Sequence, residues 1–190
     1  RGKPETDMRT ATGNALRQRF AVDTAHAERV AATACALFRQ AAAPGSERAE
    51  RKLEWAAKLH EVGCRISHSD YHRHGAYILD NTDAAGFALP ELHRLGILVL
   101  GQRGKVRKLE ADLSDASFAL QLICLRLAVA LCHARRAPDI TEMQLRMEPG
   151  TFTLKIPSRW PQAFPQSAHL LQEEMVAWQK TPWELRVLAD

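Results

Sequence analysis

Long apolar runs are missing from this sequence of 190 residues: none approaches the roughly 20 residues that a membrane-spanning helix needs. We therefore expect no membrane partner. The sequence also has no Gly-rich phosphate loop and no G-x-S-x-G turn, which excludes two widespread classes of nucleotide-binding and serine-hydrolase site. Aromatic residues make up only 6%, and only Tyr71 and Tyr77 lie near basic residues in the sequence, so recognition of nucleic acid by base stacking is disfavoured.

Cysteine is scarce and shows no C-x-x-C pair. Cys35, Cys64, Cys124 and Cys132 each lie within an apolar segment, which is typical of reduced residues in a cytoplasmic protein. The opening RGKPETDMRT has no apolar signal core and no initiator Met, and we expect the chain to be part of a longer polypeptide.

The length suits one sizeable core, or one domain with a small appendage. Apolar residues make up 46% and charged residues 25%, both ordinary for a globular protein. The net charge of +4 favours anionic partners such as phosphate chains or nucleic acid, although a basic surface can also be without function.

Helical spacing of apolar residues dominates the first two thirds of the chain. These signals predict helices over residues 7–20, from 23 to the Pro44-Gly45 pair, over 46–61 and 72–79, from Pro90 onward, and over 114–135. Asp23 is expected to cap the second helix, and the last one is apolar all round, which predicts a buried central helix.

The pattern changes after Pro138. Residues alternate in polarity on both sides of Pro149-Gly150, which predicts a β-hairpin. A helix over 167–179 and a third strand near 183–187 follow. The sequence thus predicts a mainly α protein with a small α+β part: a helical domain over residues 1–139 and a ββαβ module over 140–190.

Histidines and acidic residues recur at positions that suggest a metal site. The segments AHAERV, LHEVG and HRHGAYIL contain His26, the pair His60-Glu61, and His74. They resemble the HD-type phosphohydrolases, in which a His, a His-Asp pair and a later Asp hold a divalent metal. Two departures stand against a working site: the pair is His-Glu, and Val129 takes the place of the last Asp. We therefore interpret His26, His60 and Glu61 as a degenerate HD-like site and expect neither a bound metal nor catalysis there.

The basic residues of the same region allow a second interpretation. Charge-assisted hydrogen bonds could hold a phosphate chain, and a solvated loop surface is the alternative. The candidate binders are His68, His72, Arg73, His74, Arg103 and Lys105.

The stretch WAAKLHEVGCRISHSDYHRHGAYILDNTDAAGF resembles the C-terminal region of the Ppx/GppA exopolyphosphatases. DMRTATGNALRQRFAVDTAHAERV resembles the opening of that family's HD-like helical domain, and LICLRLAVALCHARR its long helix. FTLKIPSRWPQ and PWELRVL resemble its small terminal module. The similarity extends over most of the chain.

This resemblance implies an HD-like helical domain that does not itself catalyse, but binds and guides polyphosphate and supports a homodimer. Catalysis, with Mg²⁺, would belong to N-terminal domains of the same polypeptide, and this chain would hold no cofactor. Gln102 stands where family members often have a His, which puts one contact with the phosphate chain in doubt. A guanosine pentaphosphate phosphatase, a metal-dependent HD phosphohydrolase, a purely structural dimerisation domain and a nucleic-acid binder are the alternatives.

Overall fold

The computed structural model describes residues 4–190, with side chains from residue 8 onward, and shows an array of helices with a small sheet. Its α-helices are α1 (Pro4–Arg19), α2 (Thr24–Ala41), α3 (Glu47–Lys58), α4 (Tyr71–Asn81), α5 (Leu89–Gly101), α6 (Ala116–Leu131), α7 (Trp160–Ala163) and α8 (Pro165–Trp178). Short 3₁₀ helices are η1 (Val62–Arg65), η2 (Val106–Leu109) and η3 (Asp112–Ser114). The strands are β1 (Gln144–Glu148), β2 (Thr151–Ile156) and β3 (Glu184–Ala189). The predicted class, mainly α with a small α+β part, is confirmed.

Local signals explain where several helices begin and end. The Asp23 carboxylate accepts a hydrogen bond from the backbone N–H of His26, so it caps α2 as predicted. Asp115 does the same for α6 through the N–H groups of Ser117 and Phe118. Helix α6 is buried along most of its length, which matches its apolar sequence.

Two predicted helices are shorter than expected, and both differences bear on the site. The helix predicted over 46–61 ends at Lys58, so His60 and Glu61 lie in the turn before η1. The helix predicted over 114–135 ends at Leu131. Arg135 follows in a bend with φ of 57°, in the left-handed region that only glycine adopts without cost.

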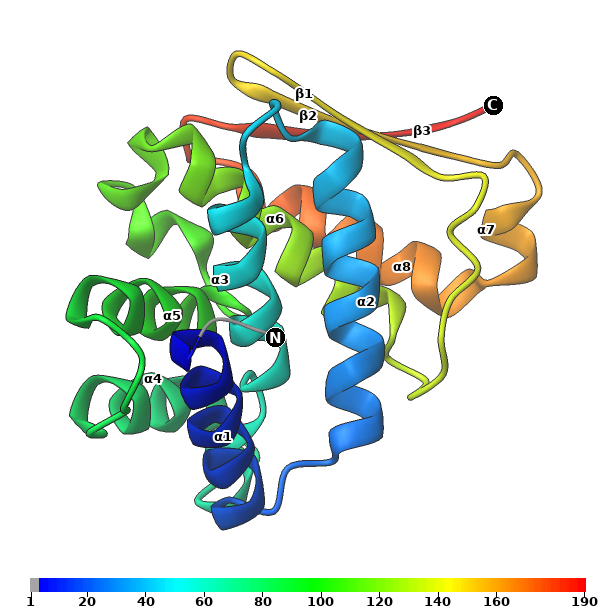
Figure 1. The fold of residues 1–190 in the computed structure, drawn as a ribbon. Coiled ribbons are helices and arrows are strands. Elements are labelled where there is room, and N and C mark those ends of the chain that lie inside the picture. The colour runs from blue at the N-terminus through cyan, green and yellow to red at the C-terminus, as the bar shows by residue number, and fades with distance from the viewer. Residues whose placement is uncertain (1–3) are drawn as a thin grey trace.

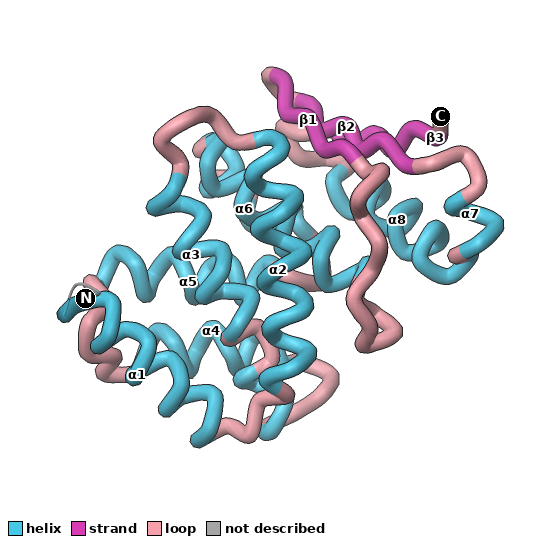
Figure 2. The backbone as a smooth tube through the Cα atoms, turned by 45° about the vertical axis from the view of Figure 1, so that its right-hand side comes forward, coloured by secondary structure: helices cyan, strands magenta, loops and turns pink. Residues whose placement is uncertain are grey.

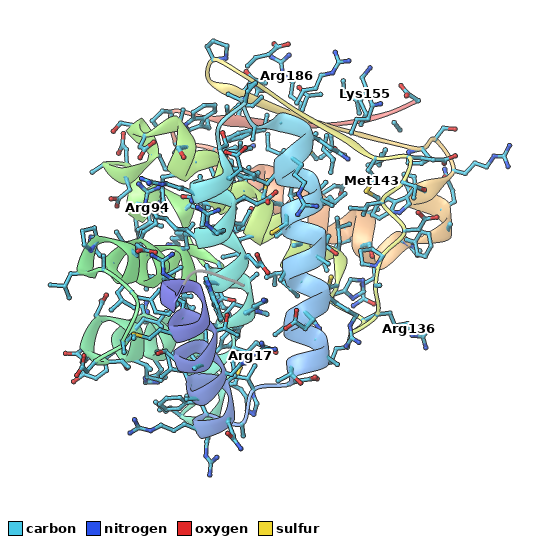
Figure 3. The ribbon with its side chains drawn as sticks, viewed as in Figure 1. Arg17, Arg94, Arg136, Met143, Lys155 and Arg186 are labelled. Carbon is cyan, nitrogen blue, oxygen red and sulfur yellow. The ribbon has the colours of Figure 1, made fainter. Side chains whose placement is uncertain are left out.

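The sheet has the order β1-β2-β3 and closes one end of the helical array (Figures 1 and 2). β1 and β2 form the predicted antiparallel hairpin across Pro149-Gly150, and β3 returns parallel to β2 after α7 and α8. Phe152, Leu154 and Ile156 of β2 face the helices. Figure 3 shows Lys155 and Arg186 on the opposite, outer face of this sheet, pointing away from the helices.

One apolar core runs through both the helical part and the terminal module: it includes residues of α2, α3, α5 and α6 together with residues of all three strands and α8. The domain boundary at residue 139 stays a prediction. Trp160 and Trp178 of the terminal module are buried. Trp183 stacks on Phe152 and donates a hydrogen bond to the carbonyl of Leu113. No described helix is long and apolar enough to span a bilayer.

Candidate functional site

His26, His60 and Glu61 converge in the structure, as the degenerate HD-like site predicts. Each offers one possible ligand atom, and these atoms all lie within 4.8 Å of one another. His26 comes from the first turn of α2, and the other two come from the turn after α3. His74 does not belong to this group of ligand atoms in the part of the chain that the structure describes.

Burial favours the uncharged form of the two imidazoles of this cluster. It lowers the pKa of His60 and that of His26, because a charged ring would lose its hydration inside the protein. The Nδ1–H of His60 donates to the carbonyl of Ala57 at 2.5 Å, which leaves Nε2 with a free lone pair. The Nδ1 atom of His26 is buried without a hydrogen-bond partner among the described residues.

Arg135 supplies a positive charge at the edge of the cluster. Its Nη2 atom lies 3.2 Å from one carboxylate oxygen of Glu61 and 2.9 Å from a carboxylate oxygen of Asp23, and its Nη1 atom donates to Glu61 at 3.4 Å. The hydrogen bond from Arg135 holds the pKa of Asp23 below its ordinary value. Glu61, the only carboxylate among the three clustered residues, therefore already has a cationic partner.

The arrangement does not fit a divalent metal. A closed site would need a further ligand from a neighbouring element, and the sequence of α6 contains neither Asp nor Glu. Val129 on that helix is half-buried against the core. With Arg135 on Glu61, the net attraction for a second cation is weak.

A second cluster, which we name the basic corner, consists of Tyr71, His72 and Arg73 of α4 together with Arg103. The guanidinium of Arg103 lies 5.1 Å from the centre of the Tyr71 ring, and its Nη1 donates to the carbonyl of His68 at 3.4 Å. Burial first, and then the charges of Arg103 and Arg73, lower the pKa of His72. The Nδ1 atom of His72 is buried and has no partner among the residues that the structure describes.

Comparison with known proteins identifies the family of this chain. Residues 8–176 match the family described as Ppx/GppA phosphatase, domain III. The chain belongs to the Ppx/GppA phosphatase family. The resemblance predicted from the sequence is thereby confirmed.

Similar curated proteins carry one name, guanosine-5'-triphosphate,3'-diphosphate pyrophosphatase. The relative from Aeromonas hydrophila is 32% identical over 97% of this chain and 38% of its own length. Those from Vibrio atlanticus and Pseudoalteromonas translucida are 31% and 30% identical, each over 96% of this chain and 38% of their own length. The chain thus spans well under half the length of these Ppx/GppA relatives.

Only some of the predicted phosphate-binding residues of this Ppx/GppA domain lie together in the structure. His72, Arg73 and Arg103 gather at the basic corner, and His68 joins them through its backbone carbonyl. Lys105 is exposed at the start of η2. His74 is half-buried two residues beyond His72, so it points to a different side of α4.

Two residues near these clusters make contacts that the sequence did not predict. Gln102 is buried and donates to the carbonyl of His60 at 2.7 Å, so it links α5 to the HD-like cluster instead of facing a ligand. Arg126 is the one charged residue in the apolar sequence of α6, and this was the feature that could have drawn attention to it. Its charge also acts on His72.

A cavity of about 590 Å³ lies apart from both clusters, between α1 and the start of α2. Arg17 lines it, and Figure 3 shows this residue low in the view, near the ends of those two helices. Arg17 forms an ion pair with Glu28. None of the predicted site residues lines this cavity.

Proposed function

We propose that this Ppx/GppA domain binds the phosphate chain of an anionic substrate at the basic corner, while hydrolysis takes place in other domains of the same polypeptide. The observation that carries the proposal is the gathering of His72, Arg73 and Arg103 at one place, where the guanidinium of Arg103 lies over the Tyr71 ring. Charge-assisted hydrogen bonds from the two arginines could hold a run of phosphate oxygens there.

Two ligands share the required chemistry. The name of the relatives favours guanosine 5'-triphosphate 3'-diphosphate. Inorganic polyphosphate offers the same run of anionic oxygens and remains the second candidate. The exposed Lys105 would extend the contact for the longer of the two chains.

The remaining parts of the proposal concern the complete protein. We expect Mg²⁺ to act in the N-terminal catalytic domains and no cofactor to bind in this chain. The four cysteines are free, in keeping with the reducing cytoplasm. A homodimer is also proposed, but its contact surface must use residues other than the buried Trp160 and Trp178. Tyr77 and Leu89, which are 68% and 81% exposed, are available.

A metal-dependent HD phosphohydrolase is the less favoured function. It would require a metal-bound water at the HD-like cluster. The salt bridges of Arg135 to Glu61 and Asp23 stand against that function.

Removing two charges from the basic corner should weaken binding of the phosphate chain. We expect the double variant Arg73→Ala/Arg103→Ala to lose at least about tenfold in affinity for guanosine pentaphosphate and for polyphosphate, because charge-assisted hydrogen bonds are lost. Titration calorimetry at low and moderate salt measures this, and wild-type affinity should fall steeply as salt rises.

A matched control removes the same charge elsewhere. Arg146 and Arg186 lie beside Thr153 on the outer face of the sheet, where Figure 3 shows Arg186 exposed. The variant Arg146→Ala/Arg186→Ala should keep most of the wild-type affinity. Equal losses in the two double variants, or no binding by the wild type at low salt, would refute the basic corner as the binding site.

A further inference from the structure

We propose that Arg135 is the built-in cation of a latent transition-metal site formed by His26, His60 and Glu61, with Asp23 beside it. In this proposal the guanidinium supplies the positive charge that a divalent ion such as Zn²⁺ would otherwise supply. The domain would therefore exclude metal through this side chain as well as through the missing fourth ligand.

Three possible ligand atoms already lie close together. The nitrogen and oxygen atoms of His26, His60 and Glu61 lie within 4.8 Å of one another, so a modest contraction would bring them around one ion. The hydrogen bond from His60 Nδ1 to the Ala57 carbonyl fixes the ring and leaves Nε2 free, which is the usual support for a metal-binding histidine. His26, only 5% exposed, has an Nδ1 atom that finds no partner among the described residues.

The guanidinium is bonded to both carboxylates at once. Nη2 of Arg135 contacts oxygens of Glu61 and Asp23, so these oxygens lie on either side of one nitrogen atom. Removing the guanidinium would leave two neighbouring carboxylates without a cation. Glu61 could then accept a metal ion together with the two histidines.

The backbone of Arg135 supports a specific role for its side chain. Its φ of 57° is a conformation in which glycine or asparagine is much less strained than arginine. The residue lies in a bend after α6, held by its N–H bond to the carbonyl of Cys132 at 2.8 Å. The bonds of its guanidinium to Glu61 and Asp23 help to hold the residue in this costly conformation.

The test is to remove the guanidinium and titrate with Zn²⁺. Arg135→Gly suits the left-handed backbone, so it should fold, and circular dichroism checks this. We expect Arg135→Gly to bind one Zn²⁺ per chain, at least about tenfold more tightly than the wild type. Zn²⁺ should also raise the melting temperature of the variant and leave that of the wild type unchanged.

Three further variants sharpen the result. Arg136→Gly makes the same substitution at the neighbouring residue, whose side chain projects away from the protein (Figure 3), and should behave as the wild type. Arg135→Gly/Glu61→Gln should lose the gained affinity, because the carboxylate ligand is gone. Asparagine also adopts the left-handed conformation at low cost, so Arg135→Asn repeats the test independently.

Each outcome decides for or against the latent site. A gain in Arg135→Gly and Arg135→Asn that disappears with Glu61→Gln supports it. Equal Zn²⁺ binding by wild type and Arg135→Gly, no binding by either glycine or asparagine variant, or binding that survives Glu61→Gln would overturn it. None of these results depends on phosphate binding at the basic corner, so the two proposals can fail separately.

Discussion

Glu174→Ala should lower the free energy of unfolding by about 3–5 kcal/mol, since it leaves a buried arginine without its counter-ion. Glu174 of α8 accepts hydrogen bonds from Arg126 Nε at 2.5 Å and from Trp178 Nε1 at 2.8 Å. Arg126 also donates to the carbonyl of Gly101 at 2.7 Å, which joins α5, α6 and α8. Chemical denaturation monitored by circular dichroism measures the loss.

The neighbouring Glu173 provides the matched control for this buried pair. Its side chain is 62% exposed and forms an ion pair with the similarly exposed His169, so Glu173→Ala should change stability by less than about 0.5 kcal/mol. The double change Arg126→Met/Glu174→Leu should cost less than Glu174→Ala alone, because it leaves no unpaired charge. Similar stability of Glu174→Ala and Glu173→Ala would show that the pair contributes little.

Gly63→Ala should destabilise the fold by about 3 kcal/mol or more, because the added methyl group meets backbone that cannot move freely. A Cβ atom at Gly63 would lie 2.1 Å from the carbonyl oxygen of Tyr71 and 2.6 Å from the backbone nitrogen of Gly75. The 3₁₀ segment η1 therefore packs directly on the start of α4. Thermal unfolding should show a fall of at least several degrees, given roughly 2–4 °C per kcal/mol for a chain of this size.

Gly96→Ala is the control for this close approach. Its Cβ would meet the Asp80 carboxylate oxygen at 2.7 Å, and that exposed side chain can rotate away. Because Gly96 lies inside α5, the substitution also gains helix propensity worth up to about 1 kcal/mol. Gly96→Ala should thus be close to neutral, and a Gly63→Ala protein equally stable would contradict the tight packing of η1 on α4.

The sequence predicted those features of the fold that depend on neighbouring residues. The Asp23 cap, the stop before Pro44-Gly45 and the hairpin across Pro149-Gly150 are local signals, and all three are present. The predicted positions of helix ends that fall inside apolar stretches were less accurate. Nothing in the sequence near Leu131 marks the end of α6, because the bend that follows depends on contacts made by Arg135.

The sequence predicted which residues form the HD-like cluster, but not the long-range contacts that surround it. His26, His60 and Glu61 were identified together and do converge. The role of Arg135 could not be predicted, since it bonds to Glu61 and Asp23 across 74 and 112 residues of sequence. Gln102 looked like a substituted ligand contact, yet its buried amide bonds to the His60 backbone, a long-range contact that no local pattern reveals.

The most direct test of the central claim is to measure binding and phosphate release in one reaction. The chain of residues 1–190 would be incubated with guanosine pentaphosphate, and separately with polyphosphate, in the presence of Mg²⁺ or Mn²⁺. We expect the ligand to bind and no inorganic phosphate to be released above the protein-free rate. Arg135 already pairs with the carboxylates at the HD-like cluster, so the cluster should not hold the metal ion that would activate a water molecule. Phosphate release that is lost in a His60→Ala protein, with its fold verified, would contradict a binding domain without catalysis.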